Sequence, residues 1–155
     1  MGIVIIDDKF LGFATALIHQ AKRSICISTF KLEMNQKPRG RNLKNFFEQV
    51  ILQAKNGVKV SLLMNWHEDQ KSVPKTNYPA SIALKNAGAK VKYLKDNRCC
   101  HAKLLIVDDK TAIIGSHNLS VKSCASNFEI SYLTMDPENI SILKNIFEMT
   151  FKEAK

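Results

Sequence analysis

Residues 101–118 read HAKLLIVDDKTAIIGSHN. The pattern within them is H-x-K-x4-D-x6-G-S-x-N. The apolar run after Lys103 is typical of a buried strand, and on a strand His101 and Lys103 project to the same face. Unpaired polar groups are costly to bury, so polar side chains beside such a strand need partners or a task. We therefore expect the chemistry of this chain to lie here.

Each polar residue type in this pattern suits work on a phosphate ester. A histidine can attack phosphorus or carry a proton near neutral pH, and a lysine two residues away can neutralise a phosphate oxygen. Ser116 and Asn118 can offer a hydroxyl and an amide after the tight turn that Gly115 permits. Glu129, on the next predicted strand, is expected to face one ring nitrogen of His101 and fix its tautomer.

Apolar spacing predicts alternating helices and strands along the chain. Helices are expected over residues 8–23, from about 42 to 56, over 79–87 and after Asp136. Strands are expected over residues 25–30, 58–64, 90–94, 101–107, 111–114 and 128–134. Two segments, 31–41 and 65–77, are expected to be loops. This order favours a single α/β domain over residues 1–155, with a mixed β-sheet sandwiched between helices.

The charge of the chain is uneven. The net charge is +9; residues 1–100 hold 17 lysines and arginines against 7 acidic residues, while residues 101–155 hold 6 against 7. Such an excess favours a polyanion, either nucleic acid or an anionic membrane surface. The residues expected to contact nucleic acid are Lys31, Lys37, Arg39, Arg41 and Arg98, with Trp66 stacking on a base. The alternatives are solvated basic faces, and a tryptophan packed on a neighbouring helix.

Other signals narrow the class of protein. No apolar run reaches the roughly 18 residues of a spanning helix, so stable membrane insertion is not expected. The N-terminus lacks the basic region of a secretory signal. As the sequence stands we expect a cytoplasmic protein, and a periplasmic or anchored one if a signal or anchor has been removed. The four cysteines form no C-x-x-C pair, so no metal site and no cofactor are expected, and a Cys26–Cys124 bridge stays open.

The motif resembles the HKD motif of the phospholipase D superfamily. The match covers the six fixed positions, with Glu129 where the family keeps an acid that orients the histidine; the matching residues are His101, Lys103, Asp108, Gly115, Ser116 and Asn118. The whole chain is similar to the small single-motif bacterial endonucleases of that superfamily. The likeness is strong over residues 99–134 and only topological over residues 1–98.

This resemblance implies a metal-independent phosphodiesterase with the phospholipase D-like fold. It implies two histidines per site, one attacking phosphorus and one protonating the leaving oxygen. Because this chain holds one HKD motif, the resemblance implies a two-fold homodimer in which both copies of His101 meet at one phosphate. By the same resemblance, Asp108 is structural rather than catalytic.

Three functions compete at this stage. The first is a nonspecific endonuclease acting on DNA, RNA or both through a phosphohistidine. The second is a phospholipid phosphodiesterase of the cardiolipin type, which is disfavoured because such enzymes typically carry an N-terminal anchor. The third is a nucleic-acid-binding module without catalysis, which is disfavoured because the motif is complete.

Overall fold

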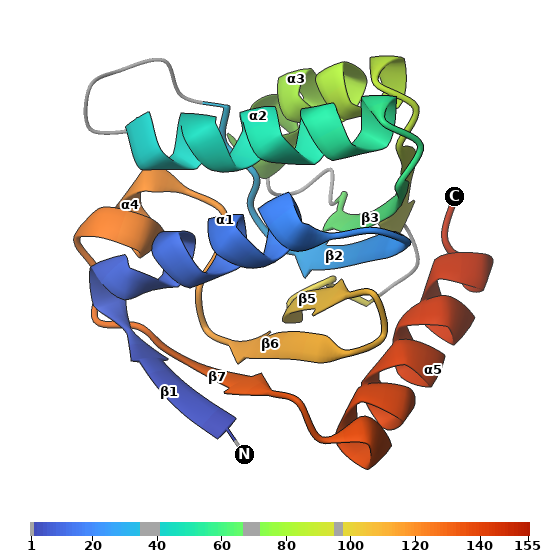
Figure 1. Ribbon diagram of the computed structural model, residues 1–155. Helices are drawn as coiled ribbons and strands as arrows, with labels where there is room; N and C mark the ends of the chain where they lie inside the picture. Colours follow the sequence, from blue (N-terminus) through green and yellow to red (C-terminus); the bar gives the residue numbers. More distant parts are fainter. Residues whose placement is uncertain (1, 35–40, 67–71, 95–97) are drawn as a thin grey trace.

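One mixed sheet is built from strands that come from most of the length of the chain. The structure, a computed structural model, describes residues 2–34, 41–66, 72–94 and 98–155. The sheet has the strand order β1-β7-β6-β5-β2-β3-β4 (Figure 1). Its strands are β1 (Gly2–Ile6), β2 (Ser24–Thr29), β3 (Lys59–Asn65), β4 (Lys90–Leu94), β5 (Lys103–Val107), β6 (Thr111–Gly115) and β7 (Ile130–Thr134). The helices are the 3-10 turn η1 (Asp7–Lys9), α1 (Phe10–Gln20), α2 (Arg41–Lys55), α3 (Ser72–Asn86), α4 (Val121–Ala125) and α5 (Pro137–Glu153).

The sheet changes strand direction between β2 and β5. Strands β2, β3 and β4 are parallel and are joined by the crossover helices α2 and α3. Strand β5 runs antiparallel to β2, and the remaining pairs out to β1 are antiparallel as well. As a result, the carboxyl ends of β2 and β3 and the start of β5 open at the same edge of the sheet.

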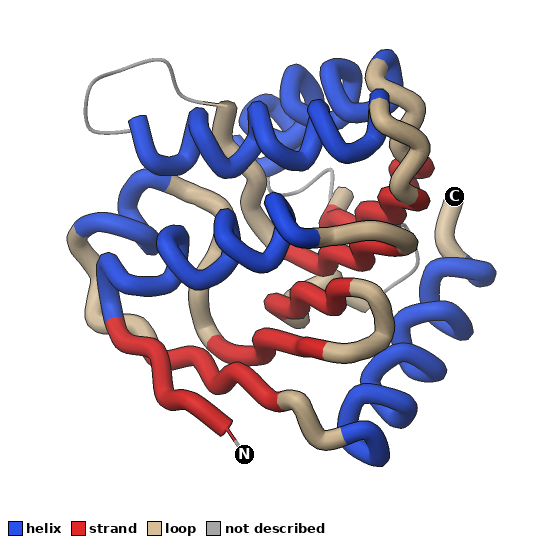
Figure 2. Tube along the Cα trace, viewed as in Figure 1, coloured by secondary structure: helices blue, strands red, loops and turns tan. Residues whose placement is uncertain are grey.

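Two apolar cores lie on the two faces of this sheet. On one face, Ile25, Ile27, Leu62 and Leu105 pack with residues of α1, α2 and α3. On the other face, α5 covers a smaller core that includes Ile106. Figure 2 shows the helices α1, α2 and α3 on one side and α5 apart from them. The predicted fold, a mixed sheet between helices, is therefore confirmed.

The structure adds elements that the sequence did not indicate. Residues 2–6 form the edge strand β1, and residues 121–125 form α4. Helix α3 begins at Ser72, whereas the sequence predicted a loop to residue 77 and a helix from Pro79, a residue that favours helix starts because it lacks an N–H. Here Pro79 lies inside the helix.

The start of the last helix agrees with the prediction from the sequence. Asp136 caps α5 by accepting the N–H of Asn139 at 2.8 Å, and Pro137 follows at the first helical position. All four cysteines are free, so the Cys26–Cys124 bridge that the sequence left open is not formed: the two side chains lie in different cores. Among the described residues, no helix is both long and apolar enough to cross a membrane.

Candidate active site

The motif residues meet at the edge where β5 begins and β6 ends. Lys103, the first residue of β5, pairs with Gly115 at the end of β6. Gly115 pairs in turn with Ser131 of β7. The register therefore places the H-x-K and G-S-x-N parts of the motif side by side.

His101 and Lys103 lie in contact at this edge. The Nζ atom of Lys103 is 2.9 Å from Nδ1 of His101 and donates to the His101 carbonyl at 2.6 Å. The imidazole is exposed, whereas the lysine is 8% exposed. Loss of hydration, followed by the nearby ammonium, lowers the pKa of His101. Burial also lowers the pKa of Lys103.

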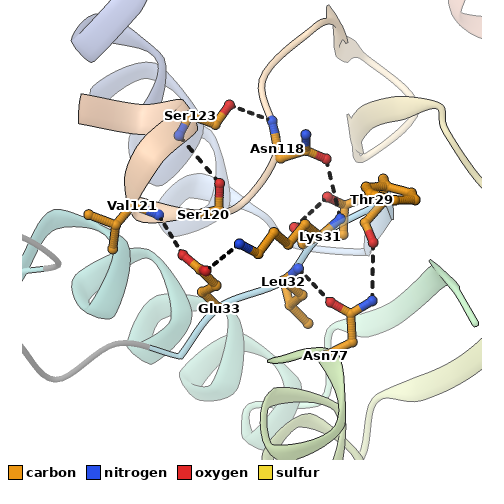
Figure 3. A network of polar contacts seen from close by, with 10 residues as sticks. Thr29, Lys31, Leu32, Glu33, Asn77, Asn118, Ser120, Val121 and Ser123 are labelled. Carbon is orange, nitrogen blue, oxygen red and sulfur yellow. Dashed lines mark hydrogen bonds and ion pairs between the residues drawn. The ribbon is translucent and has the colours of Figure 1, made fainter. Parts of the chain in front are cut away.

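Asn118 is held with its amide group oriented. Its Oδ1 accepts the N–H of Lys31 at 3.2 Å, and its own N–H donates to Ser123 Oγ at 2.8 Å (Figure 3). Because the carbonyl oxygen is turned toward Lys31, the NH₂ group points elsewhere and remains available as a donor. This arrangement suits the predicted role of Asn118 as a phosphate ligand.

Glu129 and Ser116 are hydrogen-bonded to each other in the structure. The Glu129 carboxylate makes no hydrogen bond to His101; it accepts from Ser123 at 2.7 Å, from Asn127 at 3.0 Å and from Ser116. Burial works to raise the pKa of Glu129, but these hydrogen bonds outweigh it and hold the pKa below its usual value. The Ser116 hydroxyl is thus occupied by Glu129 instead of being free for a phosphate. Its oxygen accepts the N–H of Ile130 at 3.1 Å.

Gly115 and Asp108 have structural roles: Gly115 allows β7 to approach closely, and Asp108 binds the backbone before β2. A side chain at Gly115 would meet Ser131 Oγ at 2.2 Å and Ile130 O at 2.5 Å. Close approach of β7 therefore requires this glycine, rather than the tight turn expected from the sequence. Asp108 lies at the far end of β5, where its carboxylate accepts the backbone N–H groups of residues 22, 23 and 24 at 2.7–2.9 Å. Burial opposes ionisation, yet these bonds lower the pKa of Asp108.

Several residues predicted to bind nucleic acid have partners inside the protein. Lys31 forms an ion pair with Glu33 at 2.7 Å, and Arg98 forms one with Glu153 at 3.1 Å. The indole of Trp66 packs edge-on against Tyr93, with ring centroids 5.0 Å apart, and against Tyr78 at 6.5 Å. The packed alternative thus describes Trp66 better than a free stacking platform does. Lys37, Arg39 and the side chain of Arg41 lie outside the described residues.

The sequence missed the buried residues that support the site. His117 is 2% exposed, stacks on Phe10 with ring centroids 4.5 Å apart, and lies 2.7 Å from Ser131 Oγ and 2.9 Å from Asp7 O. Burial lowers its pKa. Asn77 of α3 is fully buried and bonds to the segment after β2. The signal available in the sequence was a polar residue among the apolar residues of this helix.

Metal ligands are not gathered near this edge. Within residues 2–34, 41–66, 72–94 and 98–155, no three histidine, cysteine or acidic side chains lie close enough together to hold a metal ion. His101 instead contacts the ammonium of Lys103, and the amide of Asn118 lies at the same edge of the sheet. These groups can bind the oxygens of an anion such as a phosphate through charge and hydrogen bonds.

Comparison with known proteins agrees with this geometry. The model of a family described as cardiolipin synthase, PLD-like domain, matches residues 14–151. This chain belongs to the phospholipase D-like family. Cardiolipin synthase 1 of Bacillus anthracis is 31% identical over 149 residues, which cover 96% of this chain and 28% of the relative. The chain therefore spans about a quarter of the length of the cardiolipin synthases it matches.

Solved structures of the family share the fold. The phospholipase D family member Nuc of Salmonella typhimurium has a TM-score of 0.81 at 16% identity, covering 100% of this chain and 97% of that chain. NucT of Helicobacter pylori has a TM-score of 0.71 at 17% identity, covering 99% of this chain and 97% of that one. These phospholipase D-like neighbours match the chain in size as well as in architecture.

Proposed function

We propose that this chain is a phosphodiesterase that works without a metal ion, with His101, Lys103 and Asn118 as its catalytic residues and with nucleic acid as its substrate. The observation that carries the proposal is the meeting of the first two side chains, 2.9 Å apart, at the sheet edge that also holds Asn118. Lys103 and the Asn118 amide would bind the phosphate oxygens on which negative charge develops. Residues 1–155 would act as one catalytic domain.

The proposed reaction has two displacements at phosphorus. A ring nitrogen of one His101 attacks, forming an N–P bond while the bond to the leaving oxygen breaks. A second His101, from a partner copy, gives its proton to that oxygen. The second histidine then takes a proton from water, whose oxygen attacks phosphorus and breaks the N–P bond. Both steps conserve charge and protons without a metal ion.

The contact with Lys103 bears on which role His101 can take. While Lys103 donates to Nδ1, the proton of a neutral ring lies on Nε2, and that nitrogen is a donor. This form suits the proton donor to the leaving oxygen. When a phosphate draws the ammonium away, Nδ1 can carry the proton and Nε2 becomes the nucleophile. Substrate binding would thereby switch a resting histidine into an attacking one.

An exposed apolar surface supports the homodimer that this reaction needs. Val4, Ile6, Ile114, Ile130 and Tyr132 are 42–66% exposed and share one face of β1, β6 and β7. We call them the apolar sheet face. It lies on the same side of the sheet as α5, beside the part that α5 covers. Ile114 is two residues before Ser116, and Ile130 directly follows Glu129. Monomeric proteins rarely leave such a patch bare.

A second copy of this chain fits the apolar sheet face best. Helix α5 itself exposes Ile142, Ile146 and Met149 at 51–67%. A two-fold axis would let one self-complementary surface bury both patches at once. Because the apolar sheet face adjoins the site, the same axis would bring two copies of the catalytic edge together. One motif per chain would then supply both histidines.

Nucleic acid is the proposed substrate because of charge and size. The net charge of +9 would double in a dimer and attract a phosphate chain. The chain also matches 97% of the length of Nuc, a compact family member of this fold. A specific observation favours a second candidate, a phospholipid phosphodiesterase: the curated relatives at about 30% identity are cardiolipin synthases.

One experiment separates these functions. The protein and His101→Ala are incubated in excess EDTA with plasmid, single-stranded DNA, RNA and liposomes containing cardiolipin. Cleavage of nucleic acid that persists in EDTA and disappears in the variant is the expected result. Nuclease activity should also fall steeply as salt rises toward ~0.2 M, because backbone contacts release counterions.

The other outcomes decide against the proposal in different ways. Release of a lipid headgroup, with nucleic acid intact, would show that the protein is a phospholipid phosphodiesterase. Tight binding of nucleic acid without turnover indicates a binding module. Activity that EDTA abolishes and Mg²⁺ restores contradicts the metal-independent reaction. His19→Asn serves as a control, because it changes an exposed imidazole of α1 that bonds to Gln49 and is not part of the motif.

A further inference from the structure

The ring of Phe30 lies against the side chains of both His101 and Lys103. Its centroid is 5.3 Å from that of His101, with the ring planes tilted by 54°. The same ring has the Lys103 ammonium 5.9 Å from its centroid. Phe30 is half-buried and follows directly after β2. The ring therefore covers one side of the exposed imidazole.

The segment that carries this ring is fastened by hydrogen bonds along its length. Buried Asn77 of α3 donates to Phe30 O at 3.1 Å and to Asn65 O at 3.2 Å, and it accepts the N–H of Leu32 at 2.8 Å. Reversing the amide would lose all three bonds, so the contacts fix its orientation. A single side chain thus ties the segment Phe30–Glu33 to both β3 and α3.

The other side of the segment is joined to the catalytic motif. The N–H of Lys31 donates to Asn118, and the N–H of Glu33 donates to Leu119 O at 2.8 Å. The Glu33 carboxylate accepts the N–H of Val121 at 2.9 Å, at the start of α4 (Figure 3). The segment Phe30–Glu33 therefore touches the histidine and lysine with one side chain and the asparagine with its backbone.

We propose that Phe30, held in place by Asn77, is a positioning residue that fixes the ring of His101 and shields it from water. Glu129 was expected to orient this histidine, but its carboxylate is occupied by Ser116, Ser123 and Asn127. Within the chain, the ring of Phe30 and the ammonium of Lys103 contact His101 in place of this carboxylate. The catalytic use of His101 rests on the proposed function, whereas the placing of its ring does not.

The shielding has a direct electrostatic consequence. Loss of hydration is the larger cause of the low pKa of His101, and the Lys103 charge is the smaller one. Other titratable groups near Lys103 are the thiols of Cys99 and Cys100, which precede His101, and Glu129 from the start of β7. Removing the Phe30 ring would restore water to the imidazolium while leaving these groups in place. The pKa of His101 should then rise toward its usual value.

The test follows the imidazole directly by NMR, without substrate. The His101 signal is identified among the four histidines by its loss in His101→Ala, and its titration is compared in Phe30→Ala, Phe30→Leu and the native protein. Phe30→Ala should raise the titration midpoint, and Phe30→Leu, which keeps apolar bulk, should largely restore it. Phe13→Ala, at an exposed phenylalanine of α1, is the control and should leave the midpoint unchanged.

Kinetics give a second readout. If His101 acts as proposed, Phe30→Ala should lower kcat by about tenfold or more, since a displaced group loses reactive geometry. The acidic limb of its pH profile should move in the same direction as the NMR midpoint. Asn77→Ser, which loosens the segment without touching the ring, should shift the midpoint in the same direction by less.

Two results would overturn the inference. One is a His101 midpoint in folded Phe30→Ala equal to that of the native protein. The other is a shift that Phe30→Leu fails to restore although its spectrum is otherwise native. If Phe30→Ala does not fold, an unchanged midpoint in Asn77→Ser decides against the inference. An absence of any phosphodiesterase activity would contradict the proposed function but leave the NMR test intact.

Discussion

His117 and His101 show how differently two neighbouring histidines can be used. His101 is exposed, and among the described residues its ring contacts the phenyl ring of Phe30 and the ammonium of Lys103, so it can reach a substrate. His117 is enclosed: one ring nitrogen faces Ser131 and the other faces the carbonyl of Asp7. Neutral imidazole satisfies both partners by donating to the carbonyl and accepting from the hydroxyl. His117 thereby ties the N-terminal segment to the motif.

The first prediction concerns the stability of the protein at acidic pH, to which the buried His117 contributes. Because burial lowers the pKa of His117 in the folded protein, the unfolded chain binds the proton first as pH falls below 6.5. Stability due to this group is fully present above pH 6.5 and decreases as pH falls toward the lowered folded pKa. Urea unfolding at pH 7.5 and pH 5.0 should show a larger loss for the native protein than for His117→Asn.

The comparison between these two proteins is needed because His101 also has a lowered pKa and contributes a loss of the same sign. Its contribution is shared by both proteins and cancels in the difference. An equal loss of stability in the native protein and in His117→Asn would contradict the prediction. Glu129 and Asp108 act in the same direction only at lower pH, near the carboxylate range.

At the scale of elements, the short helix α4 supports the sheet edge that carries the motif. Ser120 caps it by accepting the N–H of Ser123 at 3.3 Å. Ser123 Oγ then joins two parts of the site, since it accepts the N–H of Asn118 and donates to Glu129. The five residues of α4 thus hold both the G-S-x-N segment and the start of β7.

The second prediction is that Ser123→Ala weakens both stability and catalysis. The variant leaves a buried N–H and a carboxylate oxygen without this partner, which should cost about 1–3 kcal/mol in the free energy of unfolding. If the proposed function is right, kcat should fall more than the affinity for substrate. Ser126→Ala is the matched control, because the exposed Ser126 hydroxyl, at the C-cap of α4, donates to Lys122 O at 3.0 Å.

Denaturation curves and steady-state kinetics of the two serine variants provide the measurement. Equal effects of Ser123→Ala and Ser126→Ala on kcat would show that α4 does not position the site. A loss of stability without any loss of kcat would assign Ser123 to the fold alone.

At the scale of the whole molecule, the sheet is covered unevenly. The face under α1, α2 and α3 is closed, whereas the opposite face is covered only where α5 lies (Figure 1). The apolar sheet face adjoins the catalytic edge, so association and catalysis are expected to depend on each other. A variant of this face should therefore change both properties together.

The third prediction tests this dependence. Tyr132→Asp, at a position 45% exposed on the apolar sheet face, should give a monomer by analytical ultracentrifugation and abolish phosphodiesterase activity. A charge on this face is costly to bury in an interface. Ile82→Asp is the control, because Ile82 is 37% exposed on α3, on the other side of the sheet. A monomeric Tyr132→Asp with full activity would exclude a shared site.

The fourth prediction concerns mixed dimers. Equal amounts of native and His101→Ala chains, unfolded together and refolded, should retain about a quarter of the activity of native protein at the same total concentration, because only native pairs hold two histidines. Independent sites would retain about half. The same two proteins mixed without unfolding serve as the reference.

The sequence by itself determined the strands of the centre of the sheet, the start of α5 and the identity of the motif residues. These follow from local rules: buried strands are apolar, and Asp-Pro begins helices. The strand predicted over residues 101–107 begins only at Lys103, so His101 lies just before it and meets the lysine through a side-chain contact. Local rules could not show that β1 joins β7, nor that α3 continues through Pro79. Both depend on packing between distant segments.

Only the tertiary structure decided which polar groups are already in use. From the sequence, Glu129 and Ser116 were free to serve His101 and a phosphate, yet folding brings them to each other and to α4. Phe30 and Asn77 carried no motif, yet folding bonds the segment after β2 to α3 and brings the ring of Phe30 against His101. The identity of a side chain limits the bonds it can make, but the partner is chosen by segments far away in the chain.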